Sequence, residues 1–534
     1  MAQLPLLIVG AGPTGLTMAL ECIRHGIDFR IVDKSVAAST QSKALAIWTG
    51  TLESLSPIGI TPDILGRGLQ VKAFKFADRG NVLASFDCAE GVDSLFPQPR
   101  ILPQNDTEAL LLEHLTAKGR SVERSVQLID LKEAADHVAA TLTHPDGAEE
   151  IAEFSYMAGC DGARSACRHL LNVDFPGSTE AQTFLLFDGE IEGHDEEPEF
   201  MASWSGDGSV VSFPVRTGTW RIICQRENAD DLSEPRLEEI QAMVERHGPP
   251  GWKLKNPLWL STFRIHERLA ANFRVGRVFL VGDAAHIHSP AGGQGMNTGI
   301  QDACNLSWKI AAALKSGATN VESHLDSYEL ERRPVAEGVL KGASDKLHFG
   351  LAHGLLARII KDIAVTTVMQ SAVFRRHMAF ELSELGVHYA ENALILADAW
   401  SYSDGGFAPG SRPRSVVVRT ADGQPIDLWE KWMHAGHTLM IFSGPDLDAA
   451  VDTIQLAREA AGEGPLILTI WHGASVPQDW EEGEILLDPD GSAHQRFGMR
   501  GAGWYWIRPD LYVAARSQPV CLETLQVAVN RFKS

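Results

Sequence analysis

The chain has 534 residues, 44% of them apolar and 22% charged, which is the composition of an ordinary globular protein with about three or four domains. Asp and Glu outnumber Lys and Arg by 69 to 47, and the net charge of −22 argues against nucleic-acid binding, because an acidic surface repels phosphate backbones. The seven cysteines form no CxxC pair and their number is odd, so we expect no disulfide framework and a cytoplasmic location.

The N-terminal segment alternates between strand and helix patterns. The apolar run Leu4–Val9 predicts a buried parallel strand, and it is too short, with no basic region before it, for a signal peptide or a membrane span. A helical apolar period follows over Leu16–His25 and stops at Gly26. The run Phe29–Val32 predicts a second strand. This order is typical of a unit that binds a dinucleotide.

A GxGxxG motif lies between the first strand and the helix. Gly10 permits a tight turn, Gly12 lets a pyrophosphate approach the backbone, and Gly15 lets the helix pack close to the sheet. The N-terminus of the helix offers free N–H groups to the phosphates. Asp33 follows Gly10 by 33 − 10 = 23 positions, near the ~20 expected of an acid that binds the ribose. The motif assigns to this site Gly10, Gly12, Pro13, Thr14, Gly15 and Asp33.

Two further motifs each place an acidic residue at the end of a strand. FSYMAGCDGARS at Phe154–Ser165 ends a strand in Asp161-Gly162 and then opens a helix. RVFLVGDAAHIHSPAGGQGMN at Arg277–Asn297 ends a strand, Val278–Val281, in Gly-Asp and continues into a glycine-rich loop. For the His pair of this loop, His286 and His288, loop hydrogen bonding is favoured over metal binding, and we expect no metal site.

These three motifs, in this order and at these distances, resemble those of the class A (single-component) FAD-dependent aromatic monooxygenases with the para-hydroxybenzoate hydroxylase fold. The later phrase YELERRPVA at Tyr328–Ala336 is similar too, and the resemblance covers almost the whole chain. It implies an α/β protein with a Rossmann-type FAD-binding domain and an antiparallel-sheet substrate domain.

The resemblance also implies roles for single residues. Asp33 takes the adenosine ribose, Gln104 lies along the FAD chain, and Asp283 lies near the ribityl chain. Asp161 and Arg164 belong to a site that serves both FAD and NAD(P)H, although a plain helix N-cap is the alternative for Asp161.

The loop Pro290–Asn297 wraps the isoalloxazine in the same comparison, and Met296 and Asn297 give backbone N–H groups to its pyrimidine edge. Lys43 and Gly50 stand where relatives commonly have Arg, and Lys keeps the charge but loses the two-pronged hydrogen bonding of Arg. The other cofactor positions that the resemblance implies are Lys34, Gly282, Gly293 and Gly295.

The middle of the chain changes to short strands. Phe200–Ser205, Val210–Val215 and Trp220–Gln225 predict an antiparallel meander, and the resemblance implies that this sheet covers the flavin and forms the substrate cavity. Four aromatic residues are candidates to line that cavity, although simple core packing is the alternative for each: Trp48, Trp204, Phe213 and Trp220. Arg216 and Arg221 are candidate anchors for an acidic substrate, with a solvated sheet edge as the alternative.

The C-terminal part alternates strands and helices after a linker that contains Asp404-Gly405-Gly406. Strands are predicted at Ser415–Arg419, Thr438–Phe442 and Leu466–Trp471, and helices at Leu428–His434, Leu447–Ala461 and Leu522–Phe532. This part resembles the thioredoxin-like domain of phenol and polyketide hydroxylases, without the CxxC that redox chemistry requires. We expect FAD-binding segments at 1–179 and 266–405, a substrate domain at 180–265 and a thioredoxin-like domain at 410–534.

The function that the resemblance implies is an FAD-dependent monooxygenase. Using NADPH or NADH and O₂, it hydroxylates an aromatic, phenolic or polyketide-like small molecule through a flavin C4a-hydroperoxide. No catalytic residue can be named, and a monomer or a homodimer is expected. The alternatives are a flavin oxidase or reductase, a Baeyer–Villiger or epoxidising oxygenase, and a non-catalytic FAD-binding scaffold.

Overall fold

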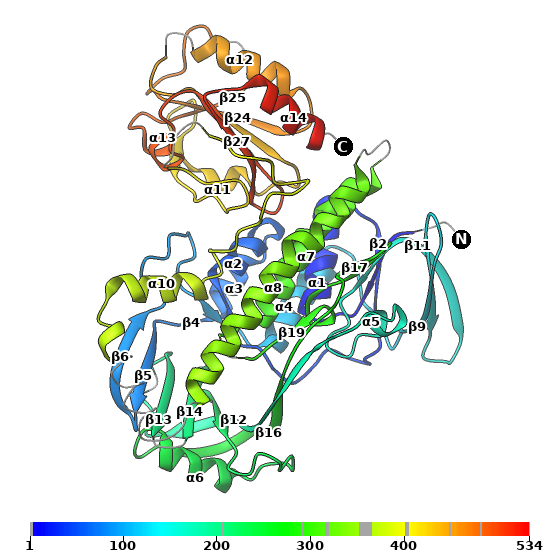
Figure 1. Cartoon of the computed structure of the whole chain (residues 1–534), viewed down its shortest axis with the longest axis vertical. Coiled ribbons are helices and arrows are strands. Elements are labelled where there is room, and N and C mark those ends of the chain that lie inside the picture. Colours follow the sequence, from blue (N-terminus) through cyan, green and yellow to red (C-terminus); the bar gives the residue numbers. More distant parts are fainter. Residues whose placement is uncertain are drawn as a thin grey trace.

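The computed structural model describes residues 4–195, 197–205, 208–290, 292–315, 320–351, 366–400, 405–447, 450–480 and 483–532. Figure 1 shows three parts: a Rossmann-type region in the middle, a large sheet at one end and the C-terminal domain at the other. The long helix α8 (Val321–Leu351) runs along the molecule between the two ends. Asp404 of the expected linker lies outside the described residues.

The Rossmann-type region is built on a sheet with a parallel centre. Its main path is β17 (Arg274–Val275), β18 (Val278–Leu280), β11 (Glu149–Gly159), β1 (Leu4–Val9), β2 (Phe29–Asp33) and β8 (Glu123–Arg124), and β10 (Val138–Thr143) and β9 (Gln127–Glu133) extend it beside β11. The predicted first strand is confirmed with its exact bounds, and the helix that follows, α1, begins earlier than expected, at Pro13, and ends at His25. Pro13 at the first helical position explains the earlier start, because its fixed φ suits a helix N-terminus.

Helices cover this sheet and bury its apolar side chains. Next to α1 lie α4 (Gln104–Ala117) and α7 (Gly295–Leu314), and α8 packs on α7. Smaller elements complete the region: the strands β3 (Ala46–Ile47), β7 (Arg100–Ile101) and β4 (Leu69–Gln70), and the helices α2 (Thr49–Leu55), α3 (Thr61–Arg67) and α5 (Ala166–Leu170). The largest hydrophobic core of the protein lies between this sheet and its helices.

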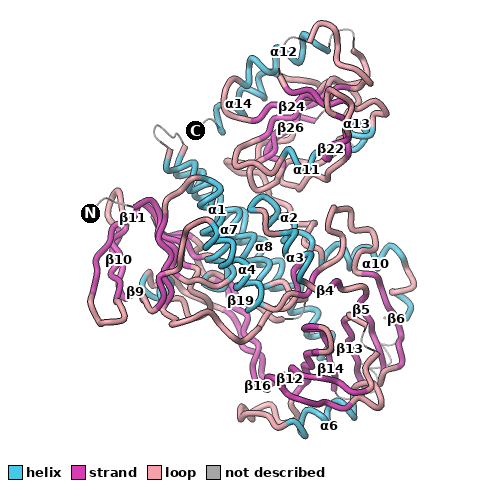
Figure 2. The backbone as a smooth tube through the Cα atoms, turned by 180° about the vertical axis from the view of Figure 1, so that it is seen from behind, coloured by secondary structure: helices cyan, strands magenta, loops and turns pink. Residues whose placement is uncertain are grey.

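The second sheet is antiparallel except for one pair of strands (Figure 2). Its order is β19 (His286–Ile287), β16 (Lys253–Leu269), β12 (Gly177–Glu192), β15 (Thr219–Gln225), β14 (Gly208–Arg216), β13 (Phe200–Ser205), β5 (Ala73–Asp78) and β6 (Asn81–Asp87). The predicted meander is confirmed as β13, β14 and β15. The hairpin β5–β6 joins this sheet from the N-terminal segment, since β5 pairs in parallel with β13.

One face of the second sheet is covered by α6 (Leu237–His247), and α10 (Ala372–Leu382) lies beside β6 at the other end (Figure 1). The face that α6 covers holds a separate small core.

The C-terminal domain contains a third sheet. Its order is β20 (Ala399–Trp400), β27 (Val513–Gln518), β26 (Gly503–Ile507), β23 (Thr438–Phe442), β24 (Leu466–Trp471), β25 (Glu484–Leu487), β21 (Val417–Arg419) and β22 (Pro425–Asp427). The helices are α11 (Leu428–Lys431), α12 (Ala450–Ala461), α13 (Ser492–Arg496) and α14 (Leu522–Phe532). The three strands predicted here are present, the first of them shortened to Val417–Arg419, and the thioredoxin-like character of the domain stays a prediction. Among the described residues, no helix combines the length and apolarity that a bilayer crossing demands.

Candidate active site

The sequence motifs meet at one edge of the Rossmann-type sheet. β18, β11, β1 and β2 are parallel neighbours, so their carboxyl ends lie side by side. Gly10 follows β1, Asp161 lies just beyond β11, Gly282 lies just beyond β18, and Asp33 ends β2. In open α/β sheets ligands bind outside the carboxyl ends of the strands. The three motifs, which are far apart in the chain, therefore form one site.

The glycines of the first turn have distinct steric reasons. Gly10 has φ of +100°, and a Cβ there would overlap the carbonyl of Cys160. A Cβ on Gly15 would overlap the carbonyl oxygen of Gly10, so helix α1 approaches the turn closely. Gly12, the N-cap of α1, has no heavy atom within 4 Å of a Cβ built on it. Space for a ligand thus opens beside Gly12, where the uncapped N–H groups of α1 point.

Asp33 is held in place by the backbone. Its Oδ2 accepts a 2.7 Å hydrogen bond from Ala11 N, and its Oδ1 accepts a 2.7 Å hydrogen bond from Ser35 N. Thr14 packs between two parts of the site, because Cβ atoms built on Gly282 and Gly299 would both crowd its Oγ1.

Two of the implied cofactor residues, Lys34 and Lys43, lie on the segment after Asp33, and a third, Gln104, lies on the start of α4, which contacts that segment. Lys34 and Lys43 are exposed. Gln104 begins α4, where its N–H donates to Ser42 Oγ at 2.7 Å and its amide donates to Glu108 Oε1 at 2.9 Å. Their predicted contacts with the cofactor remain predictions.

In the DG motif, one carboxylate oxygen of Asp161 binds the start of a helix and the other has no hydrogen-bond partner among the described residues. The N-cap of α5 is Ser165, whose Oγ accepts a 3.0 Å hydrogen bond from Arg168 N, and not Asp161, the alternative from the sequence; Asp161 Oδ2 adds a 3.1 Å hydrogen bond from Cys167 N in the first turn. Asp161 Oδ1 is buried and has no hydrogen-bond partner among the described residues. Arg164, two residues after Gly162, is exposed. A hydrogen bond to the start of α5 and ligand binding are therefore compatible for Asp161.

A buried ionic network supports the GD loop from behind. Asp302 of α7 accepts hydrogen bonds from Gly282 N at 3.1 Å and His286 Nε2 at 2.7 Å, and Arg332 Nε lies 2.6 Å from its other oxygen. Arg332 and His286 keep the pKa of the fully buried Asp302 below its usual value, against desolvation, which is the largest single influence and acts in the opposite direction. His288 Nδ1 instead donates to the carbonyl oxygen of Ser289 at 2.7 Å, so both His side chains make hydrogen bonds in or beside the loop, as expected.

The loop from Pro290 to Asn297 is anchored by two side chains. Asn297 is fully buried, accepts a 2.9 Å hydrogen bond from Trp48 N, and donates to Ala46 O and Gly293 O, both at 2.9 Å. Trp48 Nε1 donates to Gly292 O at 3.0 Å. Because the Asn297 side chain is fully engaged, only its backbone N–H, in the first turn of α7, is available to a ligand.

The other residues of this loop differ in exposure and backbone conformation. Pro290 is exposed, Gly293 has φ of +65°, Gly295 is the first residue of α7, and Met296 is partly buried against the main core. Asp283 is exposed, yet desolvation by the surrounding protein raises the pKa of its carboxyl. The charges of His286 and Lys43 act in the opposite direction and lower this pKa.

A chain of aromatic rings runs from this loop across the second sheet. The ring of Trp48 lies 6.3 Å from that of Phe200, which in turn lies 5.5 Å from Phe213 and 5.7 Å from Phe74. Trp204 continues the chain through Phe76 at 6.2 Å. Phe74, Phe76 and Phe213 are only partly buried, so part of each residue remains accessible.

The structure favours the core alternative for one candidate substrate residue, Trp220, and contradicts the solvated-edge alternative for another, Arg221. Trp220 is opposite Pro214 in the β14–β15 pair, so it projects to the other face of the sheet from Phe213, where it packs among residues of α6 and against Trp252. Trp220 is therefore a residue of the small hydrophobic core under α6.

Arg221 shares the face of Phe213 but is only 2% exposed, contrary to the solvated edge expected for it. Its guanidinium forms a two-pronged ion pair with Asp188, with both contacts at 2.8 Å, and it donates to Ser42 O and Lys43 O. Arg221 thus fastens the segment that carries Lys43. Arg216 pairs with Asp106 at the surface, as a solvated edge predicts.

Sequence reasoning missed several residues that shape the site. Arg332 belongs to the YELERRPVA phrase and Asp302 follows the third motif, but nothing in their spacing shows that they meet. Tyr328 of the YELERRPVA phrase donates to Leu280 O at 2.8 Å and thereby supports the end of β18. The only sequence signal for these residues was that they lie in or next to the motifs.

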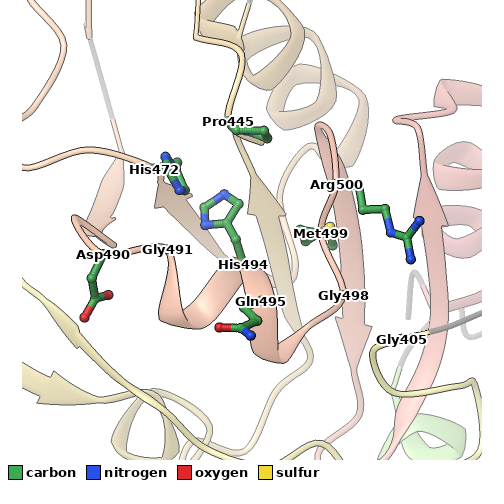
Figure 3. A pocket seen from close by; sticks show the side chains of 10 residues that line it. All are labelled: Gly405, Pro445, His472, Asp490, Gly491, His494, Gln495, Gly498, Met499 and Arg500. Atoms are coloured by element: carbon green, nitrogen blue, oxygen red, sulfur yellow. The ribbon is translucent and has the colours of Figure 1, made fainter.

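A cavity of about 460 Å³ lies elsewhere, in the C-terminal domain (Figure 3). His472 and His494 point toward each other there, with ring centres 4.9 Å apart, and His494 Nδ1 lies 2.7 Å from Asp488 Oδ2. The ten lining residues are Gly405, Pro445, His472, Asp490, Gly491, His494, Gln495, Gly498, Met499 and Arg500. None of them belongs to the motifs described above. No group of three or more His, Cys, Asp or Glu suited to a metal occurs within the described part of the chain.

The residues at the sheet edge fit FAD. The open space beside Gly12 suits a pyrophosphate at a helix N-terminus, the unpaired Asp161 Oδ1 offers a hydrogen-bond acceptor, and Asp283 is exposed just before the glycine-rich loop.

Comparison with known proteins agrees with this fit. The model of an FAD-binding domain family matches residues 3–343. A 6-methylpretetramide 4-monooxygenase of Streptomyces rimosus is 31% identical over 96% of this chain and 90% of its own length. A rifampicin monooxygenase of Streptomyces venezuelae is 36% identical over 91% and 94%. The solved structure of an aromatic hydroxylase from angucycline biosynthesis has a TM-score of 0.76 and 26% identity, covering 99% of each chain.

The chain therefore belongs to the FAD-binding domain family of flavin-dependent monooxygenases. It is an FAD-dependent monooxygenase of the class to which the sequence motifs pointed.

Proposed function

We propose that the protein uses NAD(P)H and O₂ to hydroxylate an aromatic small molecule of phenolic or polyketide-like type. The observation that carries the substrate class is the aromatic surface, a run of contacting rings from the buried Trp48, beside the glycine-rich loop, through the buried Phe200 to the partly exposed Phe213 and Phe74. Stacked and edge-on ring contacts favour a flat aromatic ligand there. The relatives named for 6-methylpretetramide and for aromatic hydroxylation support the same class.

FAD, when bound, supplies the redox chemistry and the activation of oxygen, and the chain supplies binding and orientation. In this proposal the N-terminus of α1 and Gly12 receive the pyrophosphate, Asp33 the ribose, and the first turn of α7 at Met296 and Asn297 the pyrimidine edge. Trp48 and Asn297 brace the loop between the flavin and the aromatic surface. We expect that bracing to keep water from the reacting atoms and so to limit the loss of reduced oxygen as peroxide.

The source of reducing equivalents is part of the proposal. Lys43 and Arg164 are exposed cations near the site and suit a phosphate-bearing nicotinamide nucleotide.

All seven cysteines are unpaired, which supports a reducing compartment such as the cytoplasm.

The test follows NADPH and NADH oxidation in air by the purified flavoprotein, with and without a panel of phenols, naphthols and polycyclic quinones, while hydrogen peroxide is titrated. The proposal expects one class of compound to accelerate oxidation many-fold with little peroxide. Fast oxidation without any compound, ending wholly as peroxide, would favour an oxidase instead. A bound flavin that neither nucleotide reduces would overturn the catalytic proposal.

A further inference from the structure

The C-terminal domain inserts a buried arginine into the interface with α8. Arg508 Nη1 and Nη2 lie 2.7 and 2.9 Å from the two carboxylate oxygens of Glu331, and Arg508 Nε lies 2.9 Å from Asp510 Oδ1. Lys309 of α7 completes the cluster, with Nζ at 2.7 Å from Glu331. All four side chains are buried, so the charges are matched two against two within the protein interior.

Glu331 is adjacent in sequence to the residue that holds the GD loop. Successive residues of a helix point about 100° apart, so Glu331 and Arg332 face different neighbours from one turn of α8. Glu331 faces the C-terminal domain, and Arg332 faces Asp302, which binds Gly282 N and His286. Arg332 also donates to Thr298 O, in the helix that follows the glycine-rich loop, at 3.2 Å.

A second contact reaches Arg332 from the same direction. Arg332 Nη1 donates to the hydroxyl of Tyr389 at 3.2 Å. The Tyr389 ring stacks on Tyr512 of the C-terminal domain, with ring centres 4.2 Å apart, and Arg508 lies over both rings. The backbone N–H of Tyr389 also donates a 2.9 Å hydrogen bond to Gly410 O, at the start of the C-terminal domain. The C-terminal domain thus reaches this turn of α8 by two routes, directly at Glu331 and through Tyr389 at Arg332.

We propose that the C-terminal domain is a positioning module for the flavin: through Glu331 and Tyr389 it fixes Arg332, and through Arg332 and Asp302 it fixes the GD loop. Its role is neither redox chemistry nor only the stability of its own fold. Arg332, Tyr389 and Arg508 are positioning residues, because they act on the cofactor through Asp302 and the loop. The inference goes beyond the proposed reaction and depends only on FAD binding.

The decisive comparison is between two tyrosines of the same stack. Tyr389→Phe removes the hydroxyl that Arg332 contacts and keeps the ring, while Tyr512→Phe is the matched control, because the buried hydroxyl of Tyr512 makes no hydrogen bond to Arg332 or to any other described residue. Flavin-free full-length protein is titrated with FAD, and the dissociation constant is read from flavin fluorescence. The fine structure of the visible absorption band and the unfolding temperature without FAD are also measured.

The proposal expects Tyr389→Phe to weaken FAD binding by about fivefold or more and to blur the visible band, while its FAD-free unfolding temperature stays near that of Tyr512→Phe. Tyr512→Phe should bind FAD like the native protein. Arg508→Lys, which keeps the charge and loses the two-pronged contact, should weaken FAD binding too. Unchanged FAD binding in Tyr389→Phe, or equal losses in both tyrosine variants, would overturn the proposal whatever the substrate proves to be.

Discussion

Trp48 N donates a 2.9 Å hydrogen bond to the side chain of Asn297, a residue 249 positions later in the chain. The contact joins the start of α2 to the first turn of α7, and the ring of Trp48 then reaches Gly292 O. One residue pair therefore sets the shape of the glycine-rich loop and the start of the aromatic surface.

Asn297→Ala should loosen this loop. The change removes three hydrogen bonds and leaves the buried N–H of Trp48 without an acceptor, which costs about 1–3 kcal/mol. We expect lower FAD content after gel filtration and more peroxide per NADPH oxidised. Asn530→Ala, at an exposed position, is the control and should retain native FAD content. Native coupling in Asn297→Ala would show that the loop does not depend on this brace.

Two glycines of the first turn should respond differently to alanine. At Gly12 the new methyl group meets no protein atom, so Gly12→Ala should fold with native stability and bind FAD at least about tenfold more weakly, since the methyl enters the space of the pyrophosphate. At Gly15 the methyl overlaps the carbonyl of Gly10, so Gly15→Ala should lower the unfolding temperature even without FAD. Thermal scans of both flavin-free variants, with FAD titrations, separate the two effects.

The two faces of the second sheet predict opposite results for Phe213 and Trp220. Phe213→Ala removes an accessible ring of the aromatic surface, and we expect a higher KM for the aromatic substrate with a modest change in stability. Trp220→Ala opens a cavity among Trp252, Met243 and other buried residues under α6, which costs about 3–5 kcal/mol, while KM stays near native in the protein that folds. The reverse pattern would place the substrate on the α6 face.

Stability should fall with rising pH because of Glu384. Burial raises the pKa of this carboxyl to about 8 against the opposing effects of Thr51, Gln301, Arg332 and Arg412. The folded protein therefore keeps a proton that the unfolded chain releases near the ordinary glutamate pKa of 4.5. Folding stability declines between these two pH values and levels off above the higher one.

Glu384→Gln replaces the acid by a neutral group of similar shape. We expect a higher unfolding temperature at pH 8 than in the native protein, little difference at pH 4.5, and a flatter profile between them. A parallel pair of profiles would mean that Glu384 does not titrate in this range.

Local pattern was sufficient to predict the strand–glycine turn–helix unit, because each of its residues acts on near neighbours. Leu4–Val9 and Thr438–Phe442 have the exact bounds predicted, and both are short apolar runs that end at a turn. The meeting of the three motifs at one sheet edge follows from parallel strand order, which the resemblance implied.

Contacts across long sequence separations could not be predicted. The pairing of β5 with β13 brings Phe74 beside Phe200, and no period in either segment indicates it. The face on which Trp220 lies depends on the register of β14 with β15, and a shift of one residue would reverse it. Arg221 looked like an edge cation because its partner Asp188 belongs to a strand, β12, that was not predicted.

The most direct test of the central claim is isotope incorporation. The purified flavoprotein, NADPH and the aromatic compound that best accelerates NADPH oxidation are incubated under ¹⁸O₂ in ordinary water, and the product is analysed by mass spectrometry. A monooxygenase acting on an aromatic ring predicts a product that carries one ¹⁸O atom. A product that is oxidised without ¹⁸O, with all the label in hydrogen peroxide, would contradict oxygen insertion.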